Sequence, residues 1–425
     1  MTADNNKVSF NVLLYSLSFV IVLFLNRFLV DHLSLANYGD YKIFEALIYI
    51  LTPLTVLGGH SGINLFLPSY MATNKYEKTI AYILFFSCIA VISLLLFIFV
   101  PTYLTPMLSN LFKHMHVESH SSYPFLFIVP VVAVFSMLAQ TINCTNYQNL
   151  ASFTNKVAFP SIFLISIVIF SAEQHVQSLN RIYYLYCLIY LVLTIFTAIA
   201  LIILTKKLRI PHKQDFTITK WLSQSLPLLL NTIILAALIQ VDLIILEAMT
   251  TDEKLTGIFS SILTLTTVFW VISSAQQFRY LPDMSVNLQN KQYDKLRENN
   301  KRYIISTITF TTPLIIFFIL FPSHILHWFN PKLSGYLNPL IILSIGIYLF
   351  GPGNIKNTIL SYSHHKHISV IINLVALTLL CISEYFLVPR FLLWGAIIPL
   401  ITSRALITLI SSYYCRRYFN LPFFY

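Results

Sequence analysis

Long apolar stretches recur along the whole chain and are separated by short polar connectors. Each stretch is near the ~20 residues that a helix needs to cross the hydrocarbon core of a bilayer, and a helix satisfies its own backbone groups there. The pattern predicts an all-α integral membrane protein of about 12 transmembrane helices. The predicted spans lie at about residues 8–30, 43–67, 79–103, 123–142, 152–171, 182–205, 221–248, 256–280, 303–321, 336–360, 368–388 and 392–414.

The basic residues between the spans predict the orientation. With the N-terminus inside, the inner connectors, the span ends next to them and the C-terminal tail hold 19 Lys and Arg, Lys156 among them, and the outer connectors hold 6. Positive charge accumulates on the cytoplasmic side of membrane proteins. We therefore expect both termini to be cytoplasmic.

Composition agrees with a lipid environment. Hydrophobic residues make up 57% of the chain and charged residues only 10%, whereas soluble domains carry about 25% charged residues. The net charge of +11 is spread over short connectors, so it predicts membrane topology and no nucleic-acid partner.

No soluble catalytic domain is predicted, because the connectors hardly exceed about 20 residues. The sequence GPG at 351–353 lacks the Lys and Ser/Thr of a P-loop, and the five cysteines have no paired spacing. We expect neither an enzyme nor a bound cofactor. Two histidine clusters lack the cysteines or carboxylates of a zinc site, so no metal is expected at His114, His116, His120, His364, His365 or His367.

The chain divides into two sets of six spans at the basic connector 205–220. We expect an N-terminal lobe over residues 1–208 and a C-terminal lobe over 209–425. Gly39 precedes the second span and Gly257 opens the eighth. Halves of this kind are related by an axis along the membrane normal, with substrate near their interface.

The second and eighth spans carry matching stripes of polar and small residues at helical spacing. Such a stripe lines a polar path or packs helices closely, and the sequence leaves both interpretations open. The stripes are Glu45, Tyr49, Thr52, Val56 and Gly59 in the second span, and Ser260, Thr264, Thr267, Val271 and Ser274 in the eighth.

Three stretches resemble the multidrug/oligosaccharidyl-lipid/polysaccharide (MOP) flippase superfamily, and within it the O-antigen and polysaccharide flippases. Residues 35–70 have a Gly-Tyr motif, an apolar span, a Gly-rich turn and a closing Pro. Residues 240–265 resemble the seventh-span aspartate with the following Gly-aromatic-Ser motif. Residues 371–403 resemble the eleventh-span Asn, the "Ile-Pro" loop and the Gly-Ala start of the twelfth span.

The resemblance implies a MATE/MOP-like fold, with two six-helix lobes around a central cavity that opens alternately to either face. Spans 1, 2, 7 and 8 are expected to line most of that cavity. Twelve spans fit polysaccharide flippases and multidrug antiporters better than the fourteen-span lipid II flippases.

Six polar residues in or near the spans are candidates for substrate binding. Cationic side chains are suited to a diphosphate, and carboxylates within a membrane can take up protons and couple transport to an ion gradient. The candidates are Arg27, Glu45, Asn231, Asp242, Arg279 and Arg404.

Each candidate has a structural alternative. Arg27 and Arg279 near helix ends can reach the headgroups instead, and Arg404 can form a structural ion pair. Asp242 lies eleven residues after Asn231 and so within about 20° of the same helix face. It and Glu45 can also make fixed interhelical hydrogen bonds. Two further carboxylates near outer span ends, Glu247 and Glu384, are interpreted as interfacial charges.

The expected function is outward translocation of undecaprenyl-diphosphate-linked oligosaccharide units across a bacterial cytoplasmic (inner) membrane, for O-antigen, capsule or exopolysaccharide assembly. The alternatives are a cation-coupled multidrug exporter and a membrane polymerase or ligase of surface glycans. Expected partners are the lipid-linked oligosaccharide, membrane lipids, H⁺ or Na⁺, and other membrane proteins of glycan assembly.

Overall fold

The structure, a computed structural model, describes residues 2–73, 75–111, 121–145, 147–172, 178–204 and 218–423. Every regular element in this part of the chain is a helix. The all-α fold is therefore confirmed. The outer-loop histidines at 114–120 and most of the connector 205–220 lie outside the described residues, so the division after residue 208 stays a prediction.

The chain forms two compact units. Unit 1 comprises residues 1–19, 26–39 and 241–425, and unit 2 comprises residues 20–25 and 40–240. Three helices contribute to both: α1 (Thr2–His32), α2 (Leu35–Thr55) and α9 (Ile218–Met249).

Unit 2 otherwise consists of helices between residues 59 and 204. Their bounds are α3 (Gly59–Ala72), α4 (Tyr76–Leu111), η1 (Tyr123–Ile128), α5 (Val129–Asn143), α6 (Gln148–Phe153), η2 (Thr154–Ala158), α7 (Phe159–Ala172) and α8 (Leu179–Leu204).

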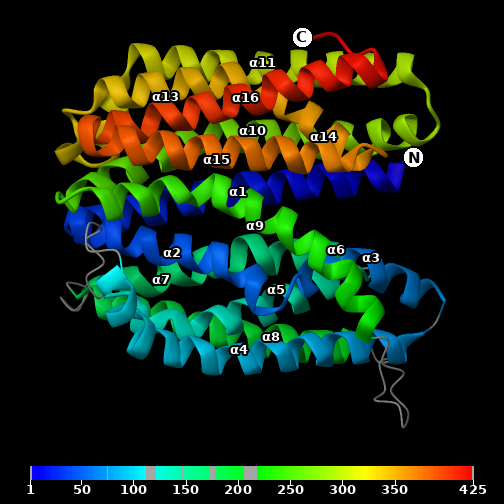
Figure 1. Cartoon of the computed structure of the whole chain (residues 1–425), viewed down its shortest axis with the longest axis horizontal. Coiled ribbons are helices and arrows are strands. Elements are labelled where there is room, and N and C mark those ends of the chain that lie inside the picture. Colours follow the sequence, from blue (N-terminus) through cyan, green and yellow to red (C-terminus); the bar gives the residue numbers. More distant parts are fainter. Residues whose placement is uncertain are drawn as a thin grey trace. The chain divides into compact units, whose positions relative to one another are not determined.

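Unit 1 is completed by the helices that follow α9. Within it, α15 and α16 lie side by side, as do α10 and α11 (Figure 1). The bounds are α10 (Lys254–Gln289), α11 (Tyr293–Leu320), α12 (Pro322–Phe329), η3 (Pro331–Leu333), α13 (Leu337–Phe350), η4 (Gly351–Gly353), α14 (Asn354–Tyr362), α15 (Lys366–Phe391) and α16 (Leu393–Phe419).

Ten helical stretches of the described chain are long and apolar enough to cross a membrane, or eleven if the bent pair α2 and α3 counts as one span. The predicted first span lies within α1. Large apolar side chains stay exposed along these helices, for example Ile202 at 71% and Val91 at 63%. Contact with lipid explains this exposure, because proteins in water rarely expose so much contiguous apolar surface.

The predicted second span, 43–67, is not one straight helix. Leu57 and Gly58 have positive φ angles of 43° and 74°, and α2 and α3 are bent by 52° at this point. Only glycine adopts such a conformation without steric strain. The predicted polar stripe through Val56 to Gly59 is therefore interrupted, and the last two members are buried.

Candidate functional site

Three ionisable side chains lie near one another inside unit 1, each from a different helix. Asp242 of α9 is 1% exposed and Glu384 of α15 is fully buried. Arg404 of α16 interacts electrostatically with Asp242, and so does Glu384. We call these three residues the charged cluster.

The two carboxylates of the charged cluster lack hydrogen bonds that would stabilise a negative charge. None of their four oxygens accepts a hydrogen bond from another described residue. Buried ionised groups are costly unless paired and hydrogen-bonded. With both carboxylates ionised the cluster carries one net negative charge, and one added proton makes it neutral. The cluster therefore has the composition of a site that gains and loses a proton.

The interpretation of Glu384 as an interfacial charge is wrong. The buried face of α15 includes Asn373, Leu380 and Glu384, and Glu384 follows Asn373 by eleven residues. This is the spacing that places Asp242 near the face of Asn231. The same signal was therefore present in the sequence of α15, although the nearness of Glu384 to the end of its span favoured the interface.

Asn231 and Asp242 lie in different surroundings although they share α9. Asn231 is half-buried in unit 2, where the neighbouring Thr232 hydroxyl lies 3.0 Å from that of Ser61. Asp242 is enclosed in unit 1. A common helix face thus does not give the two residues a common environment.

Arg27 lies near the C-terminal end of α1, in unit 1. Its Nε is 3.9 Å from Asp31 Oδ2, and its Cζ lies 4.5 Å from the centre of the Trp328 ring. Asn330 fixes the same helix end by donating to Asp31 Oδ1 at 3.1 Å and to the Val30 carbonyl at 3.2 Å. About a third of the Arg27 side chain remains exposed, so the group is held in place and still accessible.

Arg279 lies ten residues before the C-terminal end of α10. It is exposed, and its guanidinium carbon is 5.4 Å from the centre of the Tyr280 ring. This position fits a headgroup contact as well as an anion ligand.

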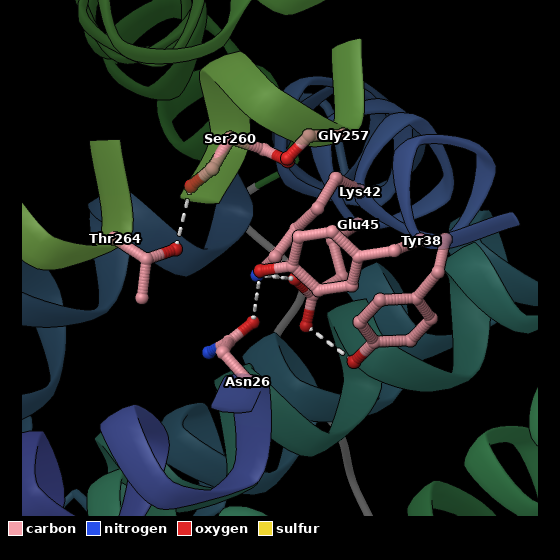
Figure 2. A network of polar contacts seen from close by, with 8 residues as sticks. Asn26, Tyr38, Lys42, Glu45, Gly257, Ser260 and Thr264 are labelled. Carbon is pink, nitrogen blue, oxygen red and sulfur yellow. Dashed lines mark hydrogen bonds and ion pairs between the residues drawn. The ribbon is translucent and has the colours of Figure 1, made fainter. Parts of the chain in front are cut away.

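Glu45 lies in unit 2 on α2, where it accepts hydrogen bonds from the Tyr41 hydroxyl and the Lys42 ammonium, both at 2.6 Å (Figure 2). Both donors belong to the same helix as Glu45. The carboxylate is 30% exposed. Its charge is balanced by Lys42, and it is held on the accessible part of the stripe beside the exposed Tyr49.

The hydroxyls of the α10 stripe bond largely to their own helix. In unit 1, Ser260 donates to the Gly257 carbonyl at 3.1 Å and Thr264 to the Ser260 carbonyl at 2.8 Å (Figure 2). Thr267 does the same to Leu263 and is exposed. Hydroxyls satisfied in this way allow close packing at the buried end and leave a mildly polar surface at the exposed end.

The fold has known relatives among transporters. An inward-facing multidrug resistance MATE family transporter of the MOP superfamily is similar with a TM-score of 0.74, at 14% identity over 96% of this chain and 94% of that one. An outward-facing multidrug resistance MATE family transporter of the MOP superfamily gives a TM-score of 0.67, at 13% identity over 97% of this chain and 95% of that one.

A third structure is a MOP superfamily transporter from Pyrococcus furiosus, described as having a binding pocket of reverse polarity that suggests a different function. It gives a TM-score of 0.66, at 12% identity over 97% of this chain and 95% of that one. At such low identities the likeness concerns the fold.

No curated protein matches the chain. A family model does: residues 7–275 match the family described as "Polysaccharide biosynthesis protein". The match covers more than half of the chain, so this multi-pass membrane protein belongs to the polysaccharide biosynthesis protein family and has the fold of MOP superfamily transporters.

Proposed function

We propose that the protein is a flippase that moves undecaprenyl-diphosphate-linked oligosaccharide units across the bacterial cytoplasmic membrane for O-antigen, capsule or exopolysaccharide assembly. The match to the polysaccharide biosynthesis family carries this proposal. The transporter fold supports movement of a cargo over chemical transformation.

The physical task fits the polar groups of the spans. Each unpaired hydroxyl moved into hydrocarbon costs several kcal/mol, on the order of 4–8, and a diphosphate costs far more. The accessible polar face of α2 in unit 2 and that of α10 in unit 1 offer hydrogen bonds at membrane depth. Arg27 and Arg279 are accessible cations for the diphosphate, whereas Arg404 faces the buried carboxylates.

Reconstitution into liposomes tests the proposal. A polyprenyl-diphosphate-linked oligosaccharide is placed in the inner leaflet, and an external glycosidase is added. Transport is expected to expose the glycan to the enzyme, while empty liposomes keep it protected. Analysis of the products for elongated or transferred glycan separates a flippase from a polymerase or ligase. Protection equal to that of empty liposomes for every glycan tried would overturn the proposal.

A second function, cation-coupled multidrug export, is favoured by one observation: the similar solved structures include multidrug transporters. The same liposomes distinguish it. Efflux of cationic dyes with unchanged glycan protection would support the exporter, and glycan flipping that dyes fail to inhibit would support the flippase.

We further propose that the charged cluster couples transport to an ion gradient. Uptake of one proton neutralises it, and a neutral cluster can tolerate burial in a state that the charged cluster disfavours. Cys381, one turn before Glu384, also interacts electrostatically with both carboxylates. D242N and E384Q are expected to flip without acceleration by an imposed pH gradient.

The matched control is E298Q, because Glu298 is an exposed carboxylate in an ion pair with Arg302. It is expected to keep the gradient response of the unmodified protein. If a Na⁺ gradient and not a pH gradient accelerates flipping by the unmodified protein, the cluster is assigned to Na⁺. If a pH gradient accelerates flipping by D242N as much as by the unmodified protein, the charged cluster does not couple transport to protons.

The proposed orientation places both termini in the cytoplasm. The 19 to 6 excess of Lys and Arg on one side supports it. A C-terminal fusion to alkaline phosphatase should be inactive and a fusion to green fluorescent protein should fluoresce. The opposite pair of results would invert the topology.

A further inference from the structure

The accessible face of α3 in unit 2 begins with three polar residues. His60, Ser61 and Asn64 lie within about 100° of one another around the helix. Asn64 is exposed and the other two are half-buried, whereas Gly62 and Phe66 on the opposite side are buried. α3 is the second half of the bent span. Because a polar group exposed to hydrocarbon is costly, this face indicates contact with water or with a polar ligand.

A chain of hydrogen bonds joins this face to α9. The Ser61 hydroxyl lies 3.0 Å from the Thr232 hydroxyl and 3.3 Å from His60 Nδ1. Thr232 donates its own proton to the Leu228 carbonyl at 2.8 Å. Ser61 therefore donates to Thr232, and His60 Nδ1 carries the proton that Ser61 accepts. In a neutral imidazole this order leaves His60 Nε2 as an acceptor, and it has no partner among the described residues.

A second bond joins the same face to α5, which packs against α3. The Gln140 amide donates to Asn64 Oδ1 at 2.5 Å. This bond uses the donor of one amide and the acceptor of the other, so within the described chain the Asn64 NH₂ group and the Gln140 carbonyl oxygen have no partner. Asn64 is exposed and Gln140 is half-buried. We call His60, Asn64 and Gln140 the amide–imidazole cluster.

The free groups of the amide–imidazole cluster include both acceptors and a donor. His60 Nε2 and the Gln140 carbonyl accept hydrogen bonds, and the Asn64 NH₂ group donates them. His60 and Asn64 are one helical turn apart, so their side chains are neighbours. A hydroxyl both donates and accepts. Neighbouring hydroxyls of one sugar ring therefore fit the cluster, and an apolar ligand would leave all three groups unsatisfied.

The cluster lies among uncharged elements. α3 and α5 contain no Asp, Glu, Lys or Arg, and neither do residues 221–240 of α9. The other half of the chain differs: the offset between the matching stripes aligns Asn64 with the exposed Arg279 of α10. A diphosphate favours a cationic partner. The neutral cluster is therefore suited to a sugar and not to the phosphates of the carrier.

We propose that the amide–imidazole cluster binds hydroxyls of neutral sugar residues in the transported glycan lipid. This inference rests on the proposed flippase function. The Asn64 amide donates to a sugar oxygen, and His60 Nε2 and the Gln140 carbonyl accept from sugar hydroxyls. The cluster thereby contributes to recognition of the glycan and leaves recognition of the diphosphate to other residues.

Binding to the purified protein in lipid nanodiscs tests the proposal. The probes are two fluorescent polyprenyl diphosphates, one with a neutral oligosaccharide and one without sugar. N64L and Q140L are each expected to raise the Kd of the sugar-bearing probe about tenfold or more, because sugar hydroxyls lose their partners. The Kd of the bare probe should stay within about twofold. The matched control S69A removes an exposed hydroxyl elsewhere on α3 and should bind both probes as the unmodified protein does.

The bare probe separates a binding role from a structural one. N64L and Q140L also remove the bond between α3 and α5, and a variant with damaged packing should bind both probes less tightly. Loss confined to the sugar-bearing probe supports the proposal. Equal losses for the two probes, or no loss for either, would overturn the inference alone. If the unmodified protein binds neither probe, the flippase proposal fails as well.

Thiol labelling tests whether water reaches the cluster. In a background with the five native cysteines replaced, N64C is treated with the membrane-impermeant reagent sulfonatoethyl methanethiosulfonate. The thiol is expected to react, because position 64 is exposed and has a hydrogen-bonding neighbour on α5. Absence of reaction would show that position 64 faces lipid or is enclosed, and it would overturn the proposal.

Discussion

Two regions of the molecule carry the same polar stripe and fold differently. In α2 and α3 the stripe leads into a break at Leu57 and Gly58 with a bend of 52°. In α10 the matching residues lie on one helix of 36 residues. The offsets that align Glu45 with Ser260 also align Gly58 with Ser273 and Gly59 with Ser274. A pair of glycines in one repeat and a pair of serines in the other therefore coincides with the structural difference.

The physical basis is steric. A residue with a side chain pays roughly 1–2 kcal/mol to adopt the left-handed region, and Gly58 adopts it freely. In α10 the buried Ser273 instead donates to the Phe269 carbonyl at 3.0 Å, as a helical hydroxyl does. The comparison shows that the polar stripe specifies one face of each helix, whereas the residue at the position of Gly58 or Ser273 decides whether the helix continues.

The following span supports each region with a tyrosine, and here too the two differ. Tyr82 of α4 donates to the Gly59 carbonyl at 2.6 Å in unit 2. Tyr303 of α11 lies 3.5 Å from the Ser273 carbonyl in unit 1, which is too long for a strong hydrogen bond. A broken helix leaves carbonyls that need a partner, and an intact helix does not.

The largest expected effect concerns the starts of the two regions, which touch within unit 1. A Cβ on Gly257 would lie 1.9 Å from the Leu35 carbonyl oxygen, whereas a Cβ on Gly39 would lie 3.0 Å from the Gly257 nitrogen. G257A is expected to destabilise the protein by about 3 kcal/mol or more and G39A by about 1 kcal/mol. Thermal unfolding in detergent measures both. Equal melting temperatures for the two variants would contradict the closer packing found at Gly257 than at Gly39.

The next effect concerns the break itself. A Cβ on Gly58 would lie 2.5 Å from the Ser225 carbonyl oxygen of α9, and its φ of 74° disfavours any side chain. G58A is expected to cost about 2–3 kcal/mol. S273A, the matched change in α10, removes one hydroxyl from an intact helix and should cost less than about 1 kcal/mol. The fraction of each variant that stays monodisperse after heating to a series of temperatures tests this pair. Equal losses for G58A and S273A would contradict the special role of Gly58.

A smaller effect is expected from the supporting tyrosines. Y82F leaves the Gly59 carbonyl without its hydroxyl donor and should destabilise by about 1–2 kcal/mol. Y303F should destabilise less than Y82F, because its hydroxyl lies 3.5 Å from the Ser273 carbonyl and that carbonyl belongs to an intact helix. Midpoints of chemical unfolding for the two variants provide the measurement. A larger loss in Y303F would reverse the interpretation of the two distances.

Much of the fold followed from the sequence because span length and apolar content depend only on the bilayer. The bend at Gly58 did not, since a glycine inside an apolar run also fits close helix packing, as Gly346 shows in α13 by its closeness to Ile401. In the site, the spacing of Asp242 predicted a helix face shared with Asn231, whereas the structure buries Asp242 and leaves Asn231 half-buried. The electrostatic influence of Glu384 and Arg404 on Asp242 could not be predicted, because it depends on which helices are neighbours and one sequence holds no such information.

The smallest effect is expected at Pro53, the residue that a sequence-based argument would hold responsible for the bend. Proline removes a helical hydrogen bond and kinks helices, yet α2 continues through Pro53 to Thr55, and the positive φ angles begin only at Leu57. The Gly58 N–H even closes the helix end on the Pro53 carbonyl at 3.1 Å.

P53A is therefore expected to keep the bend and to change stability by less than about 1 kcal/mol. Spin labels at the exposed positions 49 and 65, one on each side of the break, report the bend as a distance distribution. The distribution should match that of the unmodified protein in P53A and shift in G58A. If the distribution shifts in P53A and not in G58A, the proline and not the glycine causes the break. The reason is that replacing a residue straightens the helix only where that residue creates the bend.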